Sequence, residues 1–563
     1  MRNGTTQAEV LLFQTIGPMS LILRNVAVPG ILHIFLCALH ISIWLTFVLD
    51  LLFIVVPMVL TLTLFSDYIP LLLLAQMIIL LIFVIILTCD YYFIKRRKRT
   101  YCDLFHQIND DDYSPTKFVT YMRFYALLAT AVAILAVDFE IFPRRFAKTS
   151  IFGRSVMDVG TATFVYCFAV VDVFRHYPGR VKNGIQKQRY CPLKPSSGVV
   201  LIVLGIARTL LLHFTNYQYQ INEYGMHWNF FITLGLLRLV VNFLGRRYHL
   251  LLGIIIAFTY QYFLTKRNLQ EYLISNKTKR KDFVSKNREG IFSFCGYLSI
   301  YYLASAIANF LFTEISDQDY CDPLINFNVT EKRRRIKVWF YRSFQLLLLT
   351  AVVFVAQELA IKFVGPPSRR IANVPYILEM MNLNKKLSTG KHTQLEVHSE
   401  TKIVVDNDEN SLEILKPFLV DSINQQGLLF FVLANMLTGL VNKCINTSSV
   451  KNHYHATALI TVYMCTCVIA VHLFTRLRKK INCENFWSGA RSSRNDNSLP
   501  CSSVLVQNEE VEVKTPVVKV ICFCEKVRNY EDNILYSVCI VKYISIYLTR
   551  NCSSTSSTFT NIL

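Results

Sequence analysis

The chain has 563 residues, of which 53% are apolar and only 17% are charged, and its mean hydropathy is +0.36. A soluble protein of this length normally carries about 25% charged residues, so the composition argues against a soluble enzyme. The net charge of +21 comes largely from basic clusters at the ends of apolar segments. That placement argues against a nucleic-acid-binding protein and for signals of membrane topology.

Apolar segments long enough to cross a bilayer follow one another along the chain. Val48–Phe65 and Leu71–Thr88 hold almost no charge. At 1.5 Å per residue, each can cross a hydrocarbon core of about 30 Å. Because a bilayer offers no water to backbone groups, helix is the expected state. The sequence therefore predicts an all-α polytopic transmembrane protein with about 12 spans. The predicted spans are 26–46, 48–65, 70–92, 123–142, 158–174, 198–214, 229–244, 249–265, 290–312, 343–363, 427–442 and 456–475.

Basic clusters indicate which side of the membrane is cytoplasmic. By count of spans, all four clusters fall on one side, which the positive-inside rule makes cytoplasmic. The N-terminus then lies on the other side, as does the loop 215–228, which has no Lys or Arg. The loop 266–288, with eight such residues, is an exception. Asn3 and Asn276 lie in N-x-S/T sequons on the non-cytoplasmic side, so a glycoprotein is expected. The clusters are Lys95–Arg99, Arg175–Lys194, Arg246–Arg247 and Lys332–Lys337.

The 16 Cys residues do not form a metal-binding pattern. Many lie inside spans, where Cys behaves as a small hydrophobic residue. The pairs Cys465/Cys467 and Cys522/Cys524 are too closely spaced for a zinc knuckle. We expect no structural metal.

The first polar block at a span end begins with Asp138, which follows an apolar run. Pro143 ends the helix, and the return segment carries Arg144, Arg145 and Lys148. We expect these cations to lie close to the Asp138 carboxylate. A carboxylate beside a cation in a partly dry site has a shifted pKa and suits acid–base work. The alternative is a salt bridge that only ties two spans together.

A second block, Glu223–Phe231, stands at the entrance to a span on the same predicted side. His227 is a candidate general base, and Tyr224 or Asn229 is a candidate anchor for sugar-like hydroxyls. The alternative is a belt of Tyr and Trp at headgroup level, with Trp228 as a member.

A third block, Asn287–Gly290, directly precedes a span on that side. Arg288 is a candidate for binding a phosphodiester, and the alternative is a cation that merely flanks the span. Since all three blocks fall on one side of the membrane, a shared site is the simplest interpretation.

These blocks also identify a family. The segments AVDFEIFPRRFAK, GRSVMDVG, EYGMHWNFF and NREGIFSFCGYLSIY closely resemble the inositol acyltransferase family of glycosylphosphatidylinositol (GPI) anchor biosynthesis, the class W proteins. Lesser matches occur at Ile54–Leu64, Ser368–Asn373 and Leu428–Val441, so the resemblance covers roughly residues 45–475.

The resemblance implies a multi-pass protein of the endoplasmic reticulum membrane, usually with thirteen spans. It implies an acyltransferase that moves a fatty acyl group, typically palmitoyl, from acyl-CoA to the inositol 2-hydroxyl of glucosaminyl-phosphatidylinositol. The expected partners are therefore acyl-CoA, that lipid and the membrane, with no bound cofactor and no nucleic acid.

Roles for the candidate residues follow from the resemblance and the chemistry. The family's acidic and lysine positions fall on Asp138 and Lys148. Asp138 is the expected base, with His227 as the alternative, and Lys148 holds Asp138 ionised or stabilises the oxyanion. The motifs contain no nucleophilic Ser or Cys, so direct transfer is expected. The candidate substrate-binding residues are Arg144, Arg145, Glu223, Trp228, Asn229 and Arg288.

Two rival classes share this topology. A transporter would carry unpaired charges or broken helices near mid-membrane and show repeat symmetry, whereas the charges here are expected at span ends and no repeat is evident. A non-catalytic assembly subunit would tolerate loss of Asp138 and Lys148.

The chain departs from the family pattern in four places. Glu140 stands at a position that is usually Pro, and Arg154 at one that is usually small and polar. The span expected after Ser368–Asn373 is missing, and residues 482–563 have no counterpart. We therefore expect five parts: a lumenal N-terminal segment 1–25, a multi-span core 26–370, a polar loop 371–426, the last two spans within 427–481, and a Ser- and Cys-rich tail 482–563.

Overall fold

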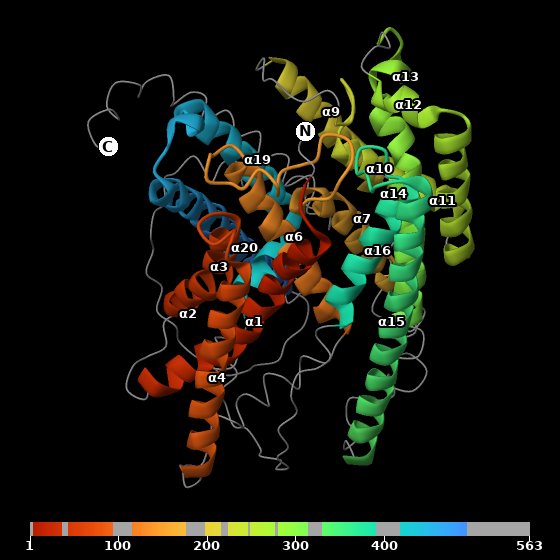
Figure 1. Cartoon of the computed structure of the whole chain (residues 1–563). Helices are drawn as coiled ribbons and strands as arrows, with labels where there is room; N and C mark the ends of the chain where they lie inside the picture. Colours follow the sequence, from red (N-terminus) through yellow and green to blue (C-terminus); the bar gives the residue numbers. More distant parts are fainter. Residues whose placement is uncertain are drawn as a thin grey trace.

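The computed structural model describes residues 4–35, 43–93, 115–175, 197–214, 223–245, 248–275, 280–312, 329–389 and 417–492. Within these ranges helices form a bundle and there is no strand (Figure 1). The predicted all-α fold is therefore confirmed.

The helices of the first half of the chain are α1 (Gln7–Phe35), α2 (Ile43–Asp50), the π-helical turn η1 (Leu51–Val55), α3 (Val56–Leu62), α4 (Ile69–Phe93), α6 (Pro115–Ala136), α7 (Val156–Arg175), α9 (Ser197–Phe214), α10 (Phe230–Leu244) and α11 (His249–Lys266). Those of the second half are α12 (Leu269–Ile274), α13 (Phe283–Lys286), α14 (Arg288–Phe312), α15 (Val329–Val364), α16 (Val374–Thr389), α18 (Phe418–Gln425), α19 (Gly427–Cys444), the 3₁₀ turn η3 (Thr447–Ser449) and α20 (His453–Ser492).

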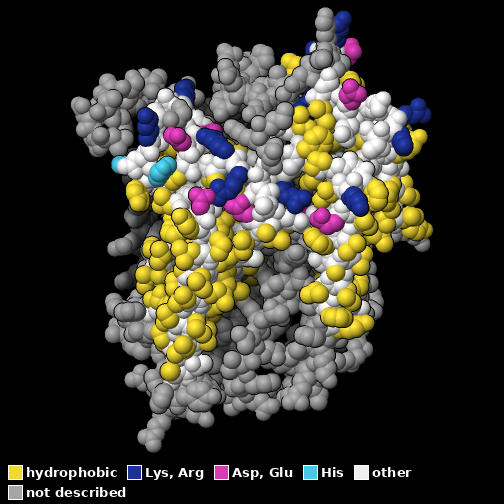
Figure 2. All heavy atoms as spheres, viewed as in Figure 1, with side chains coloured by type: hydrophobic (Ala, Val, Ile, Leu, Met, Phe, Trp, Pro, Cys, Tyr) yellow, Lys and Arg dark blue, Asp and Glu magenta, His cyan; other side chains and the backbone are white. Residues whose placement is uncertain are grey.

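Nine helical segments of the described residues are long and apolar enough to cross a membrane. Two shorter apolar helices, α9 and α10, fall on ranges that were also predicted as spans. In α4 and α15 only 11% and 17% of the apolar window is buried inside the protein. Their apolar side chains form large hydrophobic areas in Figure 2, below a band of charged side chains. These areas are where the bundle meets lipid.

The first span begins earlier than predicted. Its apolar window is Gln7–Val28, so the expected N-terminal segment 1–25 and first span 26–46 were wrong. Arg24 lies inside this window; its Nε is 2.6 Å from Asp50 Oδ1, and both side chains are buried. A charge inside a span is tolerated when another element supplies its partner. The expectation that charges sit only at span ends fails for this pair.

Residues 374–389 also differ from the prediction. They belong to the range expected to be a polar loop, but they form α16, which packs against α14 and α15. Its polar residues include Glu379 and Asn382, and both are buried. Polar side chains can occupy a membrane helix that faces protein on most sides. Farther along the expected loop, residues 390–416 lie outside the described residues, and Phe418–Gln425 forms the short helix α18.

The ends of the bundle agree with the predicted orientation. In Figure 1, α4 runs down to its last residue, Phe93, and α15 begins at the same lower end. The basic cluster 332–337 lies in this first part of α15, and the cluster 95–99 follows α4 directly. The helices α12 and α13 lie at the opposite end, with the segment 287–290 directly after α13 (Figure 1). The sequon residues Asn3 and Asn276 lie outside the described residues.

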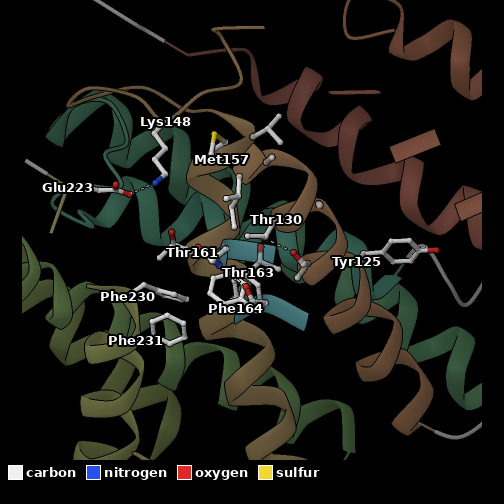
Figure 3. Close-up of a pocket in the computed structure, with 18 of the residues that line it drawn as sticks. Tyr125, Thr130, Lys148, Met157, Thr161, Thr163, Phe164, Glu223, Phe230 and Phe231 are labelled. Atoms are coloured by element: carbon white, nitrogen blue, oxygen red, sulfur yellow. Dashed lines mark hydrogen bonds and ion pairs between the residues drawn. The ribbon is translucent and has the colours of Figure 1, made fainter. Parts of the chain in front are cut away.

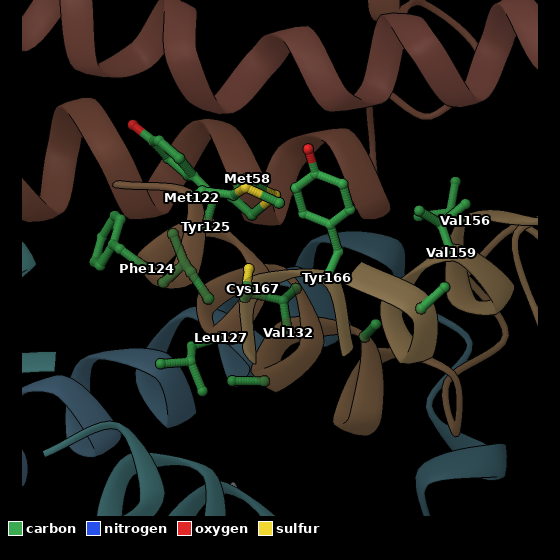
Figure 4. Packing of buried hydrophobic residues seen from close by; sticks show 14 of the residues in the cluster. Met58, Met122, Phe124, Tyr125, Leu127, Val132, Val156, Val159, Tyr166 and Cys167 are labelled. Carbon is green, nitrogen blue, oxygen red and sulfur yellow. The ribbon is translucent and has the colours of Figure 1, made fainter. Parts of the chain in front are cut away.

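The buried core that holds the polar blocks in place is built by α3, α6 and α7. Figure 4 shows Met58, Met122 and Tyr166 packed between these helices. Tight packing at this point fixes the end of α6 and the start of α7, between which the segment with Lys148 runs.

Candidate functional site

Three segments that are distant in the sequence meet at the end of the bundle opposite the start of α15. Lys148 Nζ lies 2.7 Å from Glu223 Oε1, which joins the first block to the second. The backbone N–H of His227 donates to Asn287 Oδ1 at 2.8 Å, which joins the second block to the third. Gly225 makes the second contact feasible: its φ is +116°, and a Cβ there would lie 2.5 Å from Asn287 Cα.

The second and third blocks also share a tightly packed wall. The N–H of Gly290 donates to the carbonyl oxygen of Tyr224 at 2.9 Å. A Cβ on Gly290 would lie 2.3 Å from Trp228 Cδ1, so only glycine lets the indole ring lie against the start of α14. The indole Nε1–H donates to Thr233 Oγ1 at 2.9 Å, which orients the ring. Trp228 is therefore held in one position.

A chain of four alternating charges runs through the site. Lys148 contacts Glu223, and Arg369 Nη1 lies 3.1 Å from the same Glu223 oxygen. Arg369 Nε in turn donates to Asp158 Oδ1 at 2.8 Å. Arg369 and Asp158 are buried, whereas 41% of the Lys148 side chain is exposed. In this row of four charges, the member nearest solvent is thus the ammonium group of Lys148.

Asp158 holds the buried end of this row of charges in place. Its Oδ2 accepts hydrogen bonds from the backbone and side chain of Thr149, at 3.1 and 2.8 Å, and from Ser155 Oγ at 2.8 Å. Its own N–H donates to Ser155 Oγ, in the first turn of α7. A carboxylate with this many donors at a helix N-terminus is strongly stabilised and orients the guanidinium group it binds.

The charges set the ionisation of Glu223. Burial alone would raise the pKa of Glu223, but the positive charges of Lys148 and Arg369 outweigh it and lower the pKa to about 2. Glu223 is therefore ionised at neutral pH and is a poor base; its role is to hold Lys148.

This lowered pKa predicts an acid-sensitive contribution to stability. The contribution is complete above the ordinary carboxyl pKa of 4.5 and is lost as the pH falls from there toward 2. Between pH 5 and pH 3, roughly, the wild type should therefore lose more thermal stability in detergent than Glu223→Gln. Glu140→Gln, an exposed control, should follow the wild type. Equal losses in Glu223→Gln and wild type would contradict this electrostatic picture.

A cavity of about 310 Å³ opens beside this charge chain. Lys148, Glu223 and Trp228 line one end of it. The rest is lined mostly by apolar side chains, with polar groups such as Gln14, Thr163 and Asn435 among them. In Figure 3, Lys148 and Glu223 face each other at one side, with Phe164, Phe230 and Phe231 below them. Polar groups at one end of an apolar cavity fit a ligand with a polar head and a hydrocarbon chain.

Asp138 lies beyond the lining of this cavity, four residues after Ile134, which lines it. Asn442 Nδ2 donates to Asp138 Oδ2 at 2.7 Å, and Asn435, two turns earlier on α19, also lines the cavity. Burial raises the pKa of Asp138, although the hydrogen bond from Asn442 and the charge of Arg144 oppose the rise. Asp138 is thus a half-buried carboxyl group of increased basicity.

Comparison with known proteins shows which family the chain belongs to. The GWT1 family model matches residues 1–474. This chain belongs to the GWT1 family. It is 30% identical over 397 residues to GPI-anchored wall transfer protein 1 of Candida albicans, which covers 66% of this chain and 78% of that protein. It is 32% identical over 382 residues to the protein of the same name from Saccharomyces cerevisiae, covering 65% and 74%. The family inferred from the sequence motifs is confirmed.

In this GWT1 family member, two arginines of the first block lie away from the cavity lining. Arg144 donates to the carbonyl oxygens of Val137 and Phe139, at 2.8 and 3.4 Å. Arg145 pairs with Glu9 and Asp67, at 2.8 and 2.7 Å. The expectation that all three cations gather at Asp138 was therefore wrong for Arg145, and Lys148 pairs with Glu223. Long side chains on one short turn reach in different directions, which spacing alone does not reveal.

Other predicted residues have structural contacts. Asn229 caps α10 by accepting from the N–H groups of Phe231 and Ile232, and it donates to Gly205 O on α9 at 2.8 Å. His227 is exposed and does not line the cavity. Arg288 does not line it either, since its guanidinium group is buried against Tyr272 and Glu289.

Sequence reasoning missed two members of this site, Arg369 and Asp158. Arg369 lies in Ser368–Asn373, which was noted only as a lesser family match, and Asp158 in the GRSVMDVG segment. The available signal was the pair Arg369–Arg370, separated from Pro366–Pro367 by one residue and close to the end of a span, where a charge needs a partner. Within the described residues, no group of three or more His, Cys, Asp or Glu side chains is placed to hold a metal ion.

Proposed function

We propose that this membrane protein of GPI-anchor biosynthesis transfers a fatty acyl group from acyl-CoA to the inositol 2-hydroxyl of glucosaminyl-phosphatidylinositol, in the endoplasmic reticulum membrane. The observation that carries the proposal is the cavity, with a cation at one end and a mostly apolar lining along the rest. Membership of the GWT1 family supports the same pathway.

The division of the cavity supports separate places for the two halves of an acyl thioester. The side chains of α6, α7 and α10 offer an apolar surface to the hydrocarbon chain. The thioester carbonyl then lies toward Lys148, whose ammonium group stabilises the oxyanion that forms during attack. Trp228, fixed by Thr233 and Gly290, presents a flat face to the sugar-like head of the acceptor.

In the proposed reaction, Asp138 accepts the proton of the inositol hydroxyl as its oxygen attacks the thioester carbon. Collapse of the tetrahedral oxyanion forms the ester, breaks the carbon–sulfur bond and releases the CoA thiolate. The proton held by Asp138 passes to the sulfur. The raised pKa of Asp138 suits this exchange, since a base of increased pKa removes a hydroxyl proton more effectively.

Rescue of cells that lack the acyltransferase tests this function. Expression of the chain should restore GPI-anchored proteins at the surface, and lipid analysis should detect inositol-acylated glucosaminyl-phosphatidylinositol. A transporter would restore neither the lipid product nor its formation in isolated microsomes supplied with acyl-CoA. A non-catalytic assembly subunit would rescue equally well when Asp138 and Lys148 are both replaced. Either result would refute the proposal.

A further inference from the structure

A cluster of three arginines lies behind the wall formed by Tyr224 and Trp228. All three guanidinium groups face one carboxylate, that of Glu289. Arg280 Nη2 and Nη1 donate to its two oxygens at 2.6 and 3.0 Å, and Arg370 Nη2 donates to Oε1 at 3.1 Å. Arg288 Nε lies 3.5 Å from Oε1. One carboxylate therefore stands against three positive charges.

Several donors of this cluster are unused. Nε and Nη1 of Arg288 and Nε of Arg370 are buried and have no hydrogen-bond partner among the described residues. Arg288 is fully buried, its Nη2 donates to Ser275 O, and its guanidinium carbon lies 5.1 Å from the centre of the Tyr272 ring. Burying a charged donor without a partner is costly. A group that supplies negative charge and acceptor oxygens would remove that cost.

The charges around Arg370 also indicate an excess of positive charge in this cluster. Burial and the positive charges of Arg288 and Arg280 outweigh the attraction of Glu289 and lower the pKa of Arg370. The cluster also lies at the first turn of α14, a helix of 25 residues whose N-terminal dipole adds further positive potential. The cluster therefore carries more positive than negative charge, because three guanidinium groups share the one carboxylate of Glu289.

We propose that Arg280, Arg288 and Arg370 form a binding site for a phosphate-type oxyanion. Guanidinium groups bind phosphate oxygens in paired hydrogen bonds, and phosphate accepts several donors at once. Arg280, whose side chain is 18% exposed, is the member through which the anion enters.

The position of the cluster favours a lipid headgroup as the source of the anion. Glu289 directly precedes Gly290, which contacts Tyr224 and Trp228 at the cavity wall. Arg369 and Arg370 are adjacent in the sequence but belong to different sites. Arg369 pairs with Glu223 at the cavity, and Arg370 pairs with Glu289 in the arginine cluster. An acceptor whose hydroxyl reaches the cavity can thus place its phosphodiester at the arginines. This assignment of the source rests on the proposed function, whereas the anion site itself does not.

Ligand-dependent thermal unfolding of the full-length protein in detergent tests the site without measuring acyl transfer. Inorganic phosphate should raise the unfolding temperature saturably relative to chloride at equal ionic strength. Arg280→Gln should weaken the apparent affinity about tenfold, as expected for loss of charge-assisted hydrogen bonds. Arg267→Gln, an exposed arginine at the end of α11, should bind phosphate like the wild type. An unfolding temperature of the wild type that does not respond to phosphate would overturn the proposal.

Glu289→Gln separates an anion site from a purely structural ion-pair network. Loss of the carboxylate increases the positive surplus, so the variant should be less stable alone and should be restored by phosphate at lower concentration than the wild type needs. A structural network predicts loss of stability that phosphate does not restore, which would contradict the site.

Two further ligands distinguish the sources. Glycerophosphoinositol should bind more tightly than CoA if the lipid headgroup supplies the anion. Tighter binding of CoA would overturn that assignment. Because both measurements report binding, they stand even if the rescue experiment fails.

Discussion

Replacing Asp138 by Asn is expected to lower the rate of inositol acylation in microsomes by roughly 10²- to 10⁴-fold, the range typical for loss of a general base. The amide keeps the shape of the carboxyl group and can still contact Asn442, but it cannot accept the hydroxyl proton. The rate is measured as inositol-acylated product formed from labelled acyl-CoA, normalised to the amount of protein.

Two neighbours serve as controls for Asp138. Glu140→Gln changes an exposed acid two residues away and should leave the rate close to that of the wild type. His227→Gln should do the same, because the His227 side chain is exposed, whereas that of Asp138 is half-buried. If His227→Gln abolished acylation while Asp138→Asn kept it, the base would be wrongly assigned.

The same assignment implies a pH dependence. A base works in its ionised form, so the rate should rise with pH through the pKa of Asp138, which burial places above its ordinary value. The hydrogen bond from Asn442 lowers that pKa, so Asn442→Ala should move the rising limb to higher pH. A limb that does not move would separate Asp138 from the rate-limiting proton transfer.

Replacing Lys148 by Gln is expected to lower acylation by roughly 10²- to 10³-fold, the effect of removing one group that stabilises an oxyanion. Folding should be little affected, since the ammonium group is partly exposed and the buried ion pair between Arg369 and Asp158 remains intact. The rate of acyl transfer and the unfolding temperature in detergent measure the two effects separately.

Glu223 provides a matched test of how Lys148 acts. Glu223→Gln releases the ammonium group from its 2.7 Å contact and should reduce the rate while Lys148 is present. In the Lys148→Gln background the same change should have little further effect, because Glu223 acts through Lys148. Independent, additive losses would mean that Glu223 contacts the substrate itself. Lys148→Arg should rescue only part of the rate, since a planar guanidinium group does not replace a compact ammonium group.

Much of the architecture follows from local properties of the sequence. Span positions depend on apolar runs and on the absence of water in the bilayer, and both can be judged from consecutive residues. Orientation depends on where clusters such as 332–337 fall, which is again local. The family depends on short segments such as AVDFEIFPRRFAK and could be identified without any contact.

Charged and polar residues inside the bundle could not be placed in this way. Arg24 lies inside a span, and its partner, Asp50, belongs to the next helix. Glu379 and Asn382 lie in the range expected to be a polar loop, but they are buried in α16, which packs against helices that precede it in the chain. The cost of a buried polar group depends on what lies opposite, and hydropathy along one segment does not contain that information.

The sequence by itself therefore determined the helical membrane fold, the side on which the polar blocks lie and the family. Only the tertiary structure decided which charged side chains form ion pairs with each other. It pairs Lys148 with Glu223 and places Arg369 behind them, and it pairs Arg145 with Glu9 and Asp67 rather than with Asp138. The physical reason is that an ion pair forms between side chains whose backbones approach in space, and that approach is set by the packing of helices far apart in the chain.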